Sequence, residues 1–121
     1  MMEKQYRLRK NYQFNYVYNH GKAFSDKNLV VVFCQNKNNK PKIGFSISKK
    51  FGKAVKRNKM RRRLKEIVNK RFGLLETKYN YIFLPRIKEE PATFAQLEKS
   101  VDYLLEKDKK EQAWNGYVLV C

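Results

Sequence analysis

The chain of 121 residues carries 28 Lys and Arg against 11 Asp and Glu, a formal net charge of +17. A field of this sign concentrates polyanions at the surface, so nucleic acid is the first candidate partner and an anionic membrane the second. Residues 1–10 show no apolar signal segment, and no apolar run approaches the roughly 18 residues of a membrane-spanning helix. We therefore expect a cytoplasmic protein with no membrane partner, folded as a single domain over residues 1–121.

The two cysteines give no sign of a disulfide framework. Cys34 lies within an apolar run, Cys121 is the last residue of the sequence, and neither belongs to a Cys-x-x-Cys motif. We expect a buried thiol at Cys34 and a second thiol in the tail, as is usual in a reducing compartment.

The first half of the chain predicts one short helix and two strands. Residues 1–10 form a basic arm, and Asn11 is expected to cap a helix that ends at Gly21 in the left-handed conformation. Residues 28–35 are β-branched and aromatic, and residues 42–48 alternate apolar with small polar side chains. Both segments are typical of strands, and the polar turn between them predicts a hairpin.

The second half predicts a helix, a strand and a second helix. The helix over residues 54–72 has apolar residues at helical spacing and a stop at Gly73. Residues 79–84 form an apolar strand that Pro85 ends. Thr93 and Gln96 form a capping box for the last helix, and the apolar Tyr-Val-Leu-Val run that ends the tail Trp114–Cys121 is expected to add an edge strand. The expected buried positions of the two helices are Met60, Leu64, Ile67, Val68, Phe94, Leu97, Val101, Leu104 and Leu105.

This order of elements, α-β-β-α-β-α, predicts an α+β fold. We expect a single two-layer α/β sandwich in which the helices pack against one small mixed sheet. The helix over residues 54–72 is then a basic crossover helix between neighbouring strands, for which the usual hand is right.

The segment 48–66 is the most informative part of the sequence, because more than half of its positions are Lys or Arg. At about 100° per residue, a polar stripe runs beside the apolar stripe of the helix. Arginine forks bind phosphate oxygens, and asparagine binds a base edge or a 2′-hydroxyl. A solvated basic face is the alternative, but three consecutive arginines with Glu66 as the nearby carboxylate favour an anionic partner. The members of the stripe are Asn58, Arg61, Arg62, Lys65 and Asn69.

Phe14 and Tyr18 lie four positions apart and share one face of the first helix. Unpaired RNA bases stack on such rings, whereas the alternative is ordinary core packing. Gly44, Ser46 and Ser48 share the small polar face of the predicted strand and leave room for a nucleic-acid backbone. These features are compatible with a cleft between helix and sheet.

No constellation of catalytic or metal-binding residues stands out. His20 is the only histidine, and it suits the C-terminal end of a helix. A protein nuclease needs clustered carboxylates or histidines, so we expect no catalytic residue and no metal or cofactor held by this chain. The carboxylates considered for such a role are scattered: Asp26, Asp102, Asp108, Glu89 and Glu90.

The stretch Gly52–Glu66, with Ala-Val, Arg-Asn and then spaced basic residues, resembles the signature of the ribonuclease P protein component family. The preceding Gly44–Lys50 resembles that family's strand, and Tyr6–Asn11, Phe14 and His20–Gly21 resemble its N-terminal part. The resemblance covers residues 6 to about 107 and leaves the tail, residues 110–121, outside.

The resemblance implies a ribonucleoprotein. One protein would join one ribonuclease P RNA, in which bound Mg²⁺ activates the water that removes the 5′ leader of precursor tRNA. The protein would bind both RNAs, and its crossover would be left-handed. RNA binding then falls to Arg57, Asn58, Arg61, Arg62, Lys65, Lys49, Lys50, Lys53 and Lys56, and leader binding to Phe14, Tyr18, Ser46 and Ser48.

Two positions depart from the family's pattern. Lys59 and Lys65 stand where arginine is common, which keeps the charge and loses the bidentate fork. A general RNA-binding or ribosomal accessory protein is the first alternative function, and a protein that places this helix in the DNA major groove is the second. Preference for precursor over mature tRNA separates the ribonuclease P reading from both.

Overall fold

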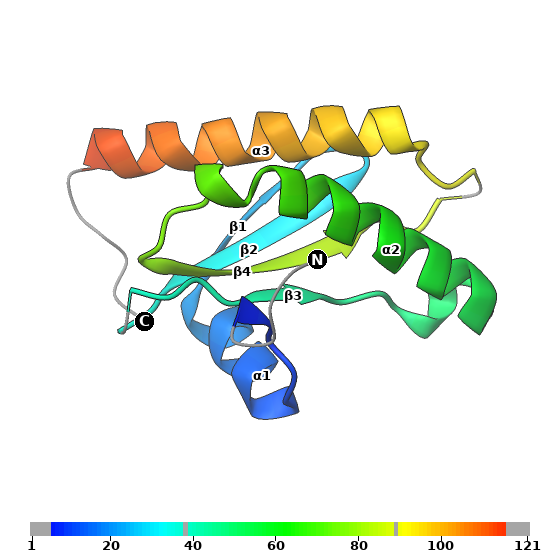
Figure 1. Ribbon diagram of the computed structural model, residues 1–121, viewed down its shortest axis with the longest axis horizontal. Coiled ribbons are helices and arrows are strands. Elements are labelled where there is room, and N and C mark those ends of the chain that lie inside the picture. Colours follow the sequence, from blue (N-terminus) through cyan, green and yellow to red (C-terminus); the bar gives the residue numbers. More distant parts are fainter. Residues whose placement is uncertain (1–5, 38, 89, 116–121) are drawn as a thin grey trace.

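The computed structural model describes residues 6–37, 39–88 and 90–115, with side chains up to residue 107. Helices α1 (Asn11–His20), α2 (Ala54–Lys70) and α3 (Phe94–Asn115) surround a four-stranded sheet (Figure 1). Its strands are β1 (Lys22–Ser25), β2 (Leu29–Gln35), β3 (Ile43–Phe45) and β4 (Tyr79–Pro85). The 3₁₀ helices η2 (Lys49–Phe51) and η3 (Phe72–Leu74) precede and follow α2. No helix in this part of the chain is long and apolar enough to cross a membrane.

The sheet is mixed, with its strands in the order β1-β2-β4-β3. β2 pairs antiparallel with β1 and with β4, and β3 pairs parallel with β4. Parallel neighbours need a crossover connection, and α2 supplies it, which confirms the α+β fold with a basic crossover helix. The left hand of this crossover stays a prediction of the family resemblance.

The predicted hairpin between residues 28–35 and 42–48 is wrong. These segments form β2 and β3, which lie on either side of β4 rather than beside each other. β2 forms its hairpin with β1, a strand that is hard to recognise because Lys22–Ser25 is short and half polar. β3 is also shorter than predicted, because its pairing with β4 covers only Ile43 to Phe45.

The two faces of the sheet carry separate hydrophobic cores. Leu29, Val31 and Phe33 of β2 join the larger core beneath α2 and α3, whereas Val32 and Cys34 join a smaller core against α1. Figure 1 shows α1 below the sheet and the other two helices above it. The predicted stripes of α2 and α3 are buried in the larger core at Met60, Leu64, Ile67, Val68, Leu97, Val101, Leu104 and Leu105, with Phe94 partly buried.

The N-terminal arm is tied to the outer edge of β3. The Leu8 amide donates to the Ile43 carbonyl at 2.9 Å, and Arg7 forms a parallel bridge with Ile43. Tyr6 packs on Phe72, with ring centroids 4.9 Å apart. The arm therefore pairs part of an edge strand that would otherwise expose its backbone groups.

Two predicted helix ends differ from the structure. The N-cap of α1 is Lys10 rather than Asn11, because the Gln13 side chain reaches back and accepts from the Lys10 amide at 3.1 Å. α2 ends at Lys70 rather than at residue 72, because the backbone tightens into η3 over Phe72–Leu74. The predicted stop at Gly73 thus lies inside this short 3₁₀ turn.

The capping box of α3 is confirmed. Thr93 Oγ1 accepts from the Gln96 amide at 3.2 Å, and Gln96 Oε1 accepts from the Thr93 amide at 3.0 Å. α3 continues to Asn115, so the first residues of the tail are helical. The edge strand predicted for the Tyr-Val-Leu-Val run that ends the tail lies outside the described residues.

The predicted burial of Cys34 is confirmed, but the predicted free thiol is wrong, because Cys34 is disulfide-bonded in the structure. Its side chain is buried in the smaller core, on the face of the sheet that α1 covers. Cys121, the other cysteine of the sequence, lies outside the described residues.

Arg71 ties the C-terminal end of α2 to α3. Its guanidinium donates to Glu98 at 3.0 Å and to Asp102, and it also donates to the Ile67 carbonyl at 3.2 Å. The hydrogen bond to Asp102 raises the pKa of Arg71. A cation at this place also suits the partial negative charge of the helix end.

Gly21 follows α1 with a φ of −91°, so the predicted left-handed conformation is wrong. Glycine is needed there for space rather than for backbone freedom. A Cβ atom would lie 2.5 Å from the Val17 carbonyl oxygen and 2.6 Å from the Phe33 carbonyl oxygen. The absence of a side chain therefore lets the end of α1 approach the backbone of β2.

We predict that Gly21→Ala destabilises the protein by about 1–3 kcal/mol, because both close atoms belong to packed backbone. Gly73→Ala is the matched control, since a Cβ at Gly73 meets nothing within 4 Å. Urea denaturation followed by circular dichroism measures both free energies of unfolding. Equal stability of the two variants would contradict the close approach of α1 to β2.

Candidate nucleic-acid interface

α2 presents its basic stripe because its apolar residues fix the rotation of the helix. Met60, Leu64, Ile67 and Val68 are buried, so the neighbouring surface of α2 faces solvent. Burial of each aliphatic side chain contributes about 1.5–3 kcal/mol, whereas each like-charge pair on the helix costs about 0.2–0.5 kcal/mol. The buried face therefore holds the helix in place against the repulsion among its cations.

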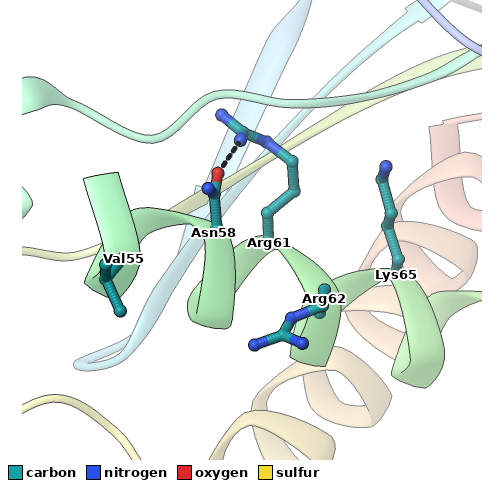
Figure 2. Close-up of a pocket in the computed structure, with 5 residues that line it drawn as sticks. All are labelled: Val55, Asn58, Arg61, Arg62 and Lys65. Carbon is teal, nitrogen blue, oxygen red and sulfur yellow. Dashed lines mark hydrogen bonds between the residues drawn. The ribbon is translucent and has the colours of Figure 1, made fainter.

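One groove on this surface is lined by Asn58, Arg61, Arg62 and Lys65, together with Val55, and has a volume of about 560 Å³. Arg61 Nη1 donates to Asn58 Oδ1 at 3.1 Å. Figure 2 shows Arg61 and Lys65 extending in a similar direction from α2, whereas Arg62 extends in a different direction. The structure thus brings four of the predicted RNA-binding residues together. We call this set of five residues the α2 groove.

The α2 groove concentrates positive charge without a carboxylate to balance it. Burial, together with the charges of Arg7 and Arg61, lowers the pKa of Lys65. Among the described residues, no ion pair joins Arg61, Arg62 or Lys65 to an acid. Phosphate oxygens in the groove would attract each of these cations, so an anionic ligand removes the repulsion.

The lysines before α2 lie on a short, capped turn. Ser48 Oγ accepts from the Lys50 amide at 3.1 Å, and this bond begins η2. Gly52 follows with a φ of +149°, which favours glycine, and Lys53 is the N-cap of α2. Ser48 therefore acts as a cap, while the exposed Lys49, Lys50 and Lys53 extend the basic surface toward the N-terminal end of α2.

Two predicted RNA-binding residues that belong to α2 itself lie outside the α2 groove. Arg57 is partly buried, and its Nε atom is buried with no hydrogen-bond partner among the described residues. Lys56 lines a second groove on the other flank of α2. Since successive helix residues point about 100° apart, a run of basic residues necessarily divides between the flanks of one helix.

α1, which carries Phe14 and Tyr18, packs on the opposite face of the sheet from α2 (Figure 1). Phe14 packs on Gly44 so closely that a Cβ there would lie 2.6 Å from the phenyl ring. Tyr18 is 38% exposed. Phe14 is therefore held by packing against β3, and Tyr18 offers the more open ring.

α1 leaves part of this face of the sheet open. Val30 of β2 and Leu84 of β4 are only partly buried, although both lie in the middle of the sheet. Ser46 follows β3, and its amide donates to the Phe83 carbonyl at 3.1 Å. Of the predicted leader-binding residues, Phe14 and Tyr18 thus belong to this face, and Ser46 follows β3 at the edge of the sheet, whereas Ser48 lies farther on, in the cap of η2. We call this surface the α1 face.

The titratable side chains considered for catalysis have structural partners. His20 Nδ1 lies 3.0 Å from the Tyr16 carbonyl oxygen, and the two rings are stacked. Asp26 accepts from the amides of Asn28 and Leu29 in the turn before β2. Within the described ranges, no three His, Cys, Asp or Glu side chains gather closely enough to hold a metal ion.

Two residues of the α2 surface were not predicted from the sequence. Arg7 acts on Lys65 from the N-terminal arm, and no local pattern places that arm beside α2. Val55 is 78% exposed in the α2 groove, where it can contact a ribose or a base edge. An apolar residue inside a basic segment, off the buried stripe, was the available signal for Val55.

A basic helix face and an aromatic surface, carried on opposite faces of one mixed sheet, define an α+β nucleic-acid-binding protein. Comparison of the whole chain then gives the family. Residues 2–109 match the family described as Ribonuclease P. The chain belongs to the ribonuclease P protein family, whose members are protein components of an endoribonuclease. The match ends within α3, so the tail, residues 110–121, lies outside it.

The relatives and structural neighbours are bacterial proteins. The ribonuclease P protein component of Clostridioides difficile strain 630 is 37% identical over 101 residues, which is 83% of this chain and 89% of the relative. That of Streptococcus pneumoniae strain Hungary19A-6 is 30% identical over 115 residues, 95% of this chain and 94% of the relative. A Staphylococcus aureus RNase P protein mutant with defective mRNA degradation activity has a TM-score of 0.81 at 32% identity, covering 89% of this chain and 92% of that chain. The RNase P protein of Thermotoga maritima has a TM-score of 0.75 at 28% identity, covering 84% and 96%.

We predict that Lys65→Met raises the melting temperature of the free protein by about 1–3 °C at low ionic strength. The lowered pKa of Lys65 means that the folded chain holds this proton less tightly than the unfolded chain, so the charge destabilises the fold. Salt near 1 M screens the repulsion from Arg7 and Arg61 but not the cost of burying the charge, so it should reduce the gain without abolishing it. Lys99→Met, at an exposed site on α3, is the control and should change little. A lower melting temperature for Lys65→Met would contradict this account of the groove.

Proposed function

We propose that the chain serves ribonuclease P by binding two RNAs on two surfaces. The α2 groove binds the ribonuclease P RNA, and the α1 face holds the 5′ leader of precursor tRNA. The RNA subunit, with bound Mg²⁺, carries out the hydrolysis at the 5′ end of the tRNA. The protein contributes position and charge, with one protein per RNA subunit, in the cytoplasm.

The unbalanced cations of the α2 groove are the observation that carries this proposal. Arg61 and Arg62 are consecutive, so they point in different directions around the helix (Figure 2). This arrangement suits phosphates along a folded RNA better than the edges of adjacent bases. Asn58, bonded to Arg61, offers its amide N–H groups to a base edge or a 2′-hydroxyl.

The α1 face suits a single strand because it combines rings with partly exposed apolar side chains. A base stacked on an aromatic side chain contributes about 1–3 kcal/mol, whatever its sequence. Tyr18 supplies the open ring, and Val30 and Leu84 supply apolar surface from the sheet. The separation of this face from the α2 groove allows two RNAs to bind one protein.

The assignment of Mg²⁺ to the RNA follows from the chemistry of the side chains. Metal-assisted hydrolysis needs oxygen ligands that hold the ion beside the scissile phosphate. His20, Asp26 and Asp102 are engaged with Tyr16, the β2 turn and Arg71 respectively. Phosphate oxygens of the RNA are suitable ligands for Mg²⁺. The cations of α2 screen the repulsion between the two RNAs and so lower the Mg²⁺ concentration that assembly requires.

We expect the protein to stimulate cleavage of precursor tRNA by a bacterial ribonuclease P RNA at low Mg²⁺. Arg61→Gln combined with Arg62→Gln should abolish most of this stimulation, because it removes two phosphate contacts from the α2 groove. The measurement is the single-turnover cleavage rate of a 5′-labelled precursor across a Mg²⁺ series. High Mg²⁺ should restore the rate, since excess counterions replace the protein's screening.

The control variant is Lys27→Gln combined with Lys99→Gln, which removes the same charge from exposed sites on the β1–β2 turn and α3. It should stimulate as the unmodified chain does. Equal loss in both double variants would mean that net charge alone acts, and the α2 groove would have no special role. Cleavage by the protein without RNA would contradict the assignment of catalysis to the RNA subunit.

Tyr18→Ala should weaken binding of precursor tRNA to the holoenzyme by about 5- to 150-fold, the loss of one stacked base. Binding of mature tRNA, which has no leader, should not change. Tyr12→Ala is the matched control, because Tyr12 lies on the same helix and is 67% exposed. An equal loss of affinity for both tRNAs in Tyr18→Ala would contradict the assignment of leader binding to the α1 face.

A further inference from the structure

The second groove on α2 has a different chemistry from the first. It lies on the other flank of the helix and has a volume of about 400 Å³, within the range of sites for small organic ligands. Its lining combines two phenyl rings, a methionine and three cations: Phe51, Phe94, Met60, Lys56, Lys59 and Arg63. Of the described residues that line it, none carries a carboxylate. We call it the Phe51–Phe94 groove.

Local structure fixes each wall of this groove. Phe51 ends the capped η2 turn, and Phe94 begins α3 immediately after its capping box. Arg63 Nη1 donates to the Ala92 carbonyl at 3.5 Å, which draws its guanidinium toward the segment that leads into α3. Figure 1 shows the start of α2 and the start of α3 at the same end of the molecule. Contacts within the chain therefore hold the walls of the groove in place.

The rings are anchored on one side and accessible on the other. Phe51 and Phe94 pack partly against the larger core, while both also line the groove. Met60 is 3% exposed and closes the floor between them. Lys56 and Lys59 are exposed, so their ammonium groups stand at the rim. Apolar rings inside a cationic rim are the combination that binds unpaired nucleotides, with the base on a ring and the phosphates on the cations.

We propose that the Phe51–Phe94 groove binds an unpaired nucleotide of RNA, at a site separate from both surfaces assigned above. The base stacks on Phe51 or Phe94, and the flanking phosphates contact Lys56, Lys59 and Arg63. The α2 groove offers donors and one exposed valine but no ring, so it suits the backbone of folded RNA. One flank of α2, the α2 groove, thus binds folded RNA, and the other flank, the Phe51–Phe94 groove, binds an unpaired nucleotide.

The first test is photo-crosslinking of the full chain to a short oligouridylate that contains 4-thiouridine, with peptides mapped by mass spectrometry. The experiment uses the Tyr18→Ala background, which weakens the α1 face, so that failure of this groove and failure of the proposed leader site are read separately. Crosslinks to the peptides of Phe51 or Phe94 are expected. Crosslinks confined to α1 or to the Asn58–Lys65 flank would overturn the proposal.

The second test is affinity for the same oligomer, measured by fluorescence anisotropy in that background. Phe51→Leu combined with Phe94→Leu keeps apolar side chains at both sites and removes both stacking faces, so it should weaken binding about tenfold. An abasic oligomer with the same phosphates should bind the unmodified groove as weakly as the uridylate binds this double variant. Equal affinities for abasic and uridylate oligomers would overturn the stacking that the proposal requires.

Lys56→Gln combined with Lys59→Gln changes only exposed side chains, so it guards against misfolding of the phenylalanine variant. This double variant should bind the oligouridylate with lower affinity, and the salt dependence of that affinity should have a smaller slope. An acidic peptide that loses affinity in these variants while the oligomer keeps it would assign the groove to protein instead.

In the reconstituted holoenzyme, 4-thiouridine placed in either the ribonuclease P RNA or the precursor tRNA identifies which RNA supplies the nucleotide. Crosslinks to the groove from neither RNA would overturn the proposal.

Discussion

Repulsion among the cations of α2 is the constraint on which the rest of the structure depends. A helix with so many like charges would not persist on its own propensity, and α2 persists because its apolar stripe is buried and because Arg71 ties its end to α3. The repulsion acts on the polar stripe of α2, where burial, together with the charges of Arg7 and Arg61, lowers the pKa of Lys65. The fold stabilises a charge arrangement that is unfavourable until an anion joins it, which is what an RNA-binding surface requires.

The sheet topology decides where that surface lies. The parallel pairing of β3 with β4 makes α2 a crossover, so α2 covers one face of the sheet next to α3. α1 enters from the N-terminal arm and covers part of the other face. The sheet therefore separates the α2 groove from the ring of Tyr18. Under the proposed function, this separation lets one protein hold two RNAs apart on the two faces of one sheet.

Local features of the sequence predicted the parts of the structure that depend on local physics. Helical spacing placed the buried stripe of α2 and the row from Asn58 to Lys65, and the Thr93–Gln96 pair marked the start of α3. The hairpin prediction failed because the partner of β3 is β4, far along the chain, and no short-range pattern distinguishes a hairpin from a crossover there. The position of Arg7 beside Lys65 was not predicted for the same reason, because only the pairing of the N-terminal arm with β3 brings the two residues near each other.

The most direct measurement is the salt dependence of the affinity of the full chain for ribonuclease P RNA. It compares the unmodified protein with a triple variant, Arg61→Gln, Arg62→Gln and Lys65→Gln. Each lost phosphate contact reduces the slope of log K against log salt by about 0.7–0.9, so the account predicts a slope smaller by about 2–3 in the variant. An unchanged slope, with affinity retained, would contradict the claim that the α2 groove binds the RNA backbone.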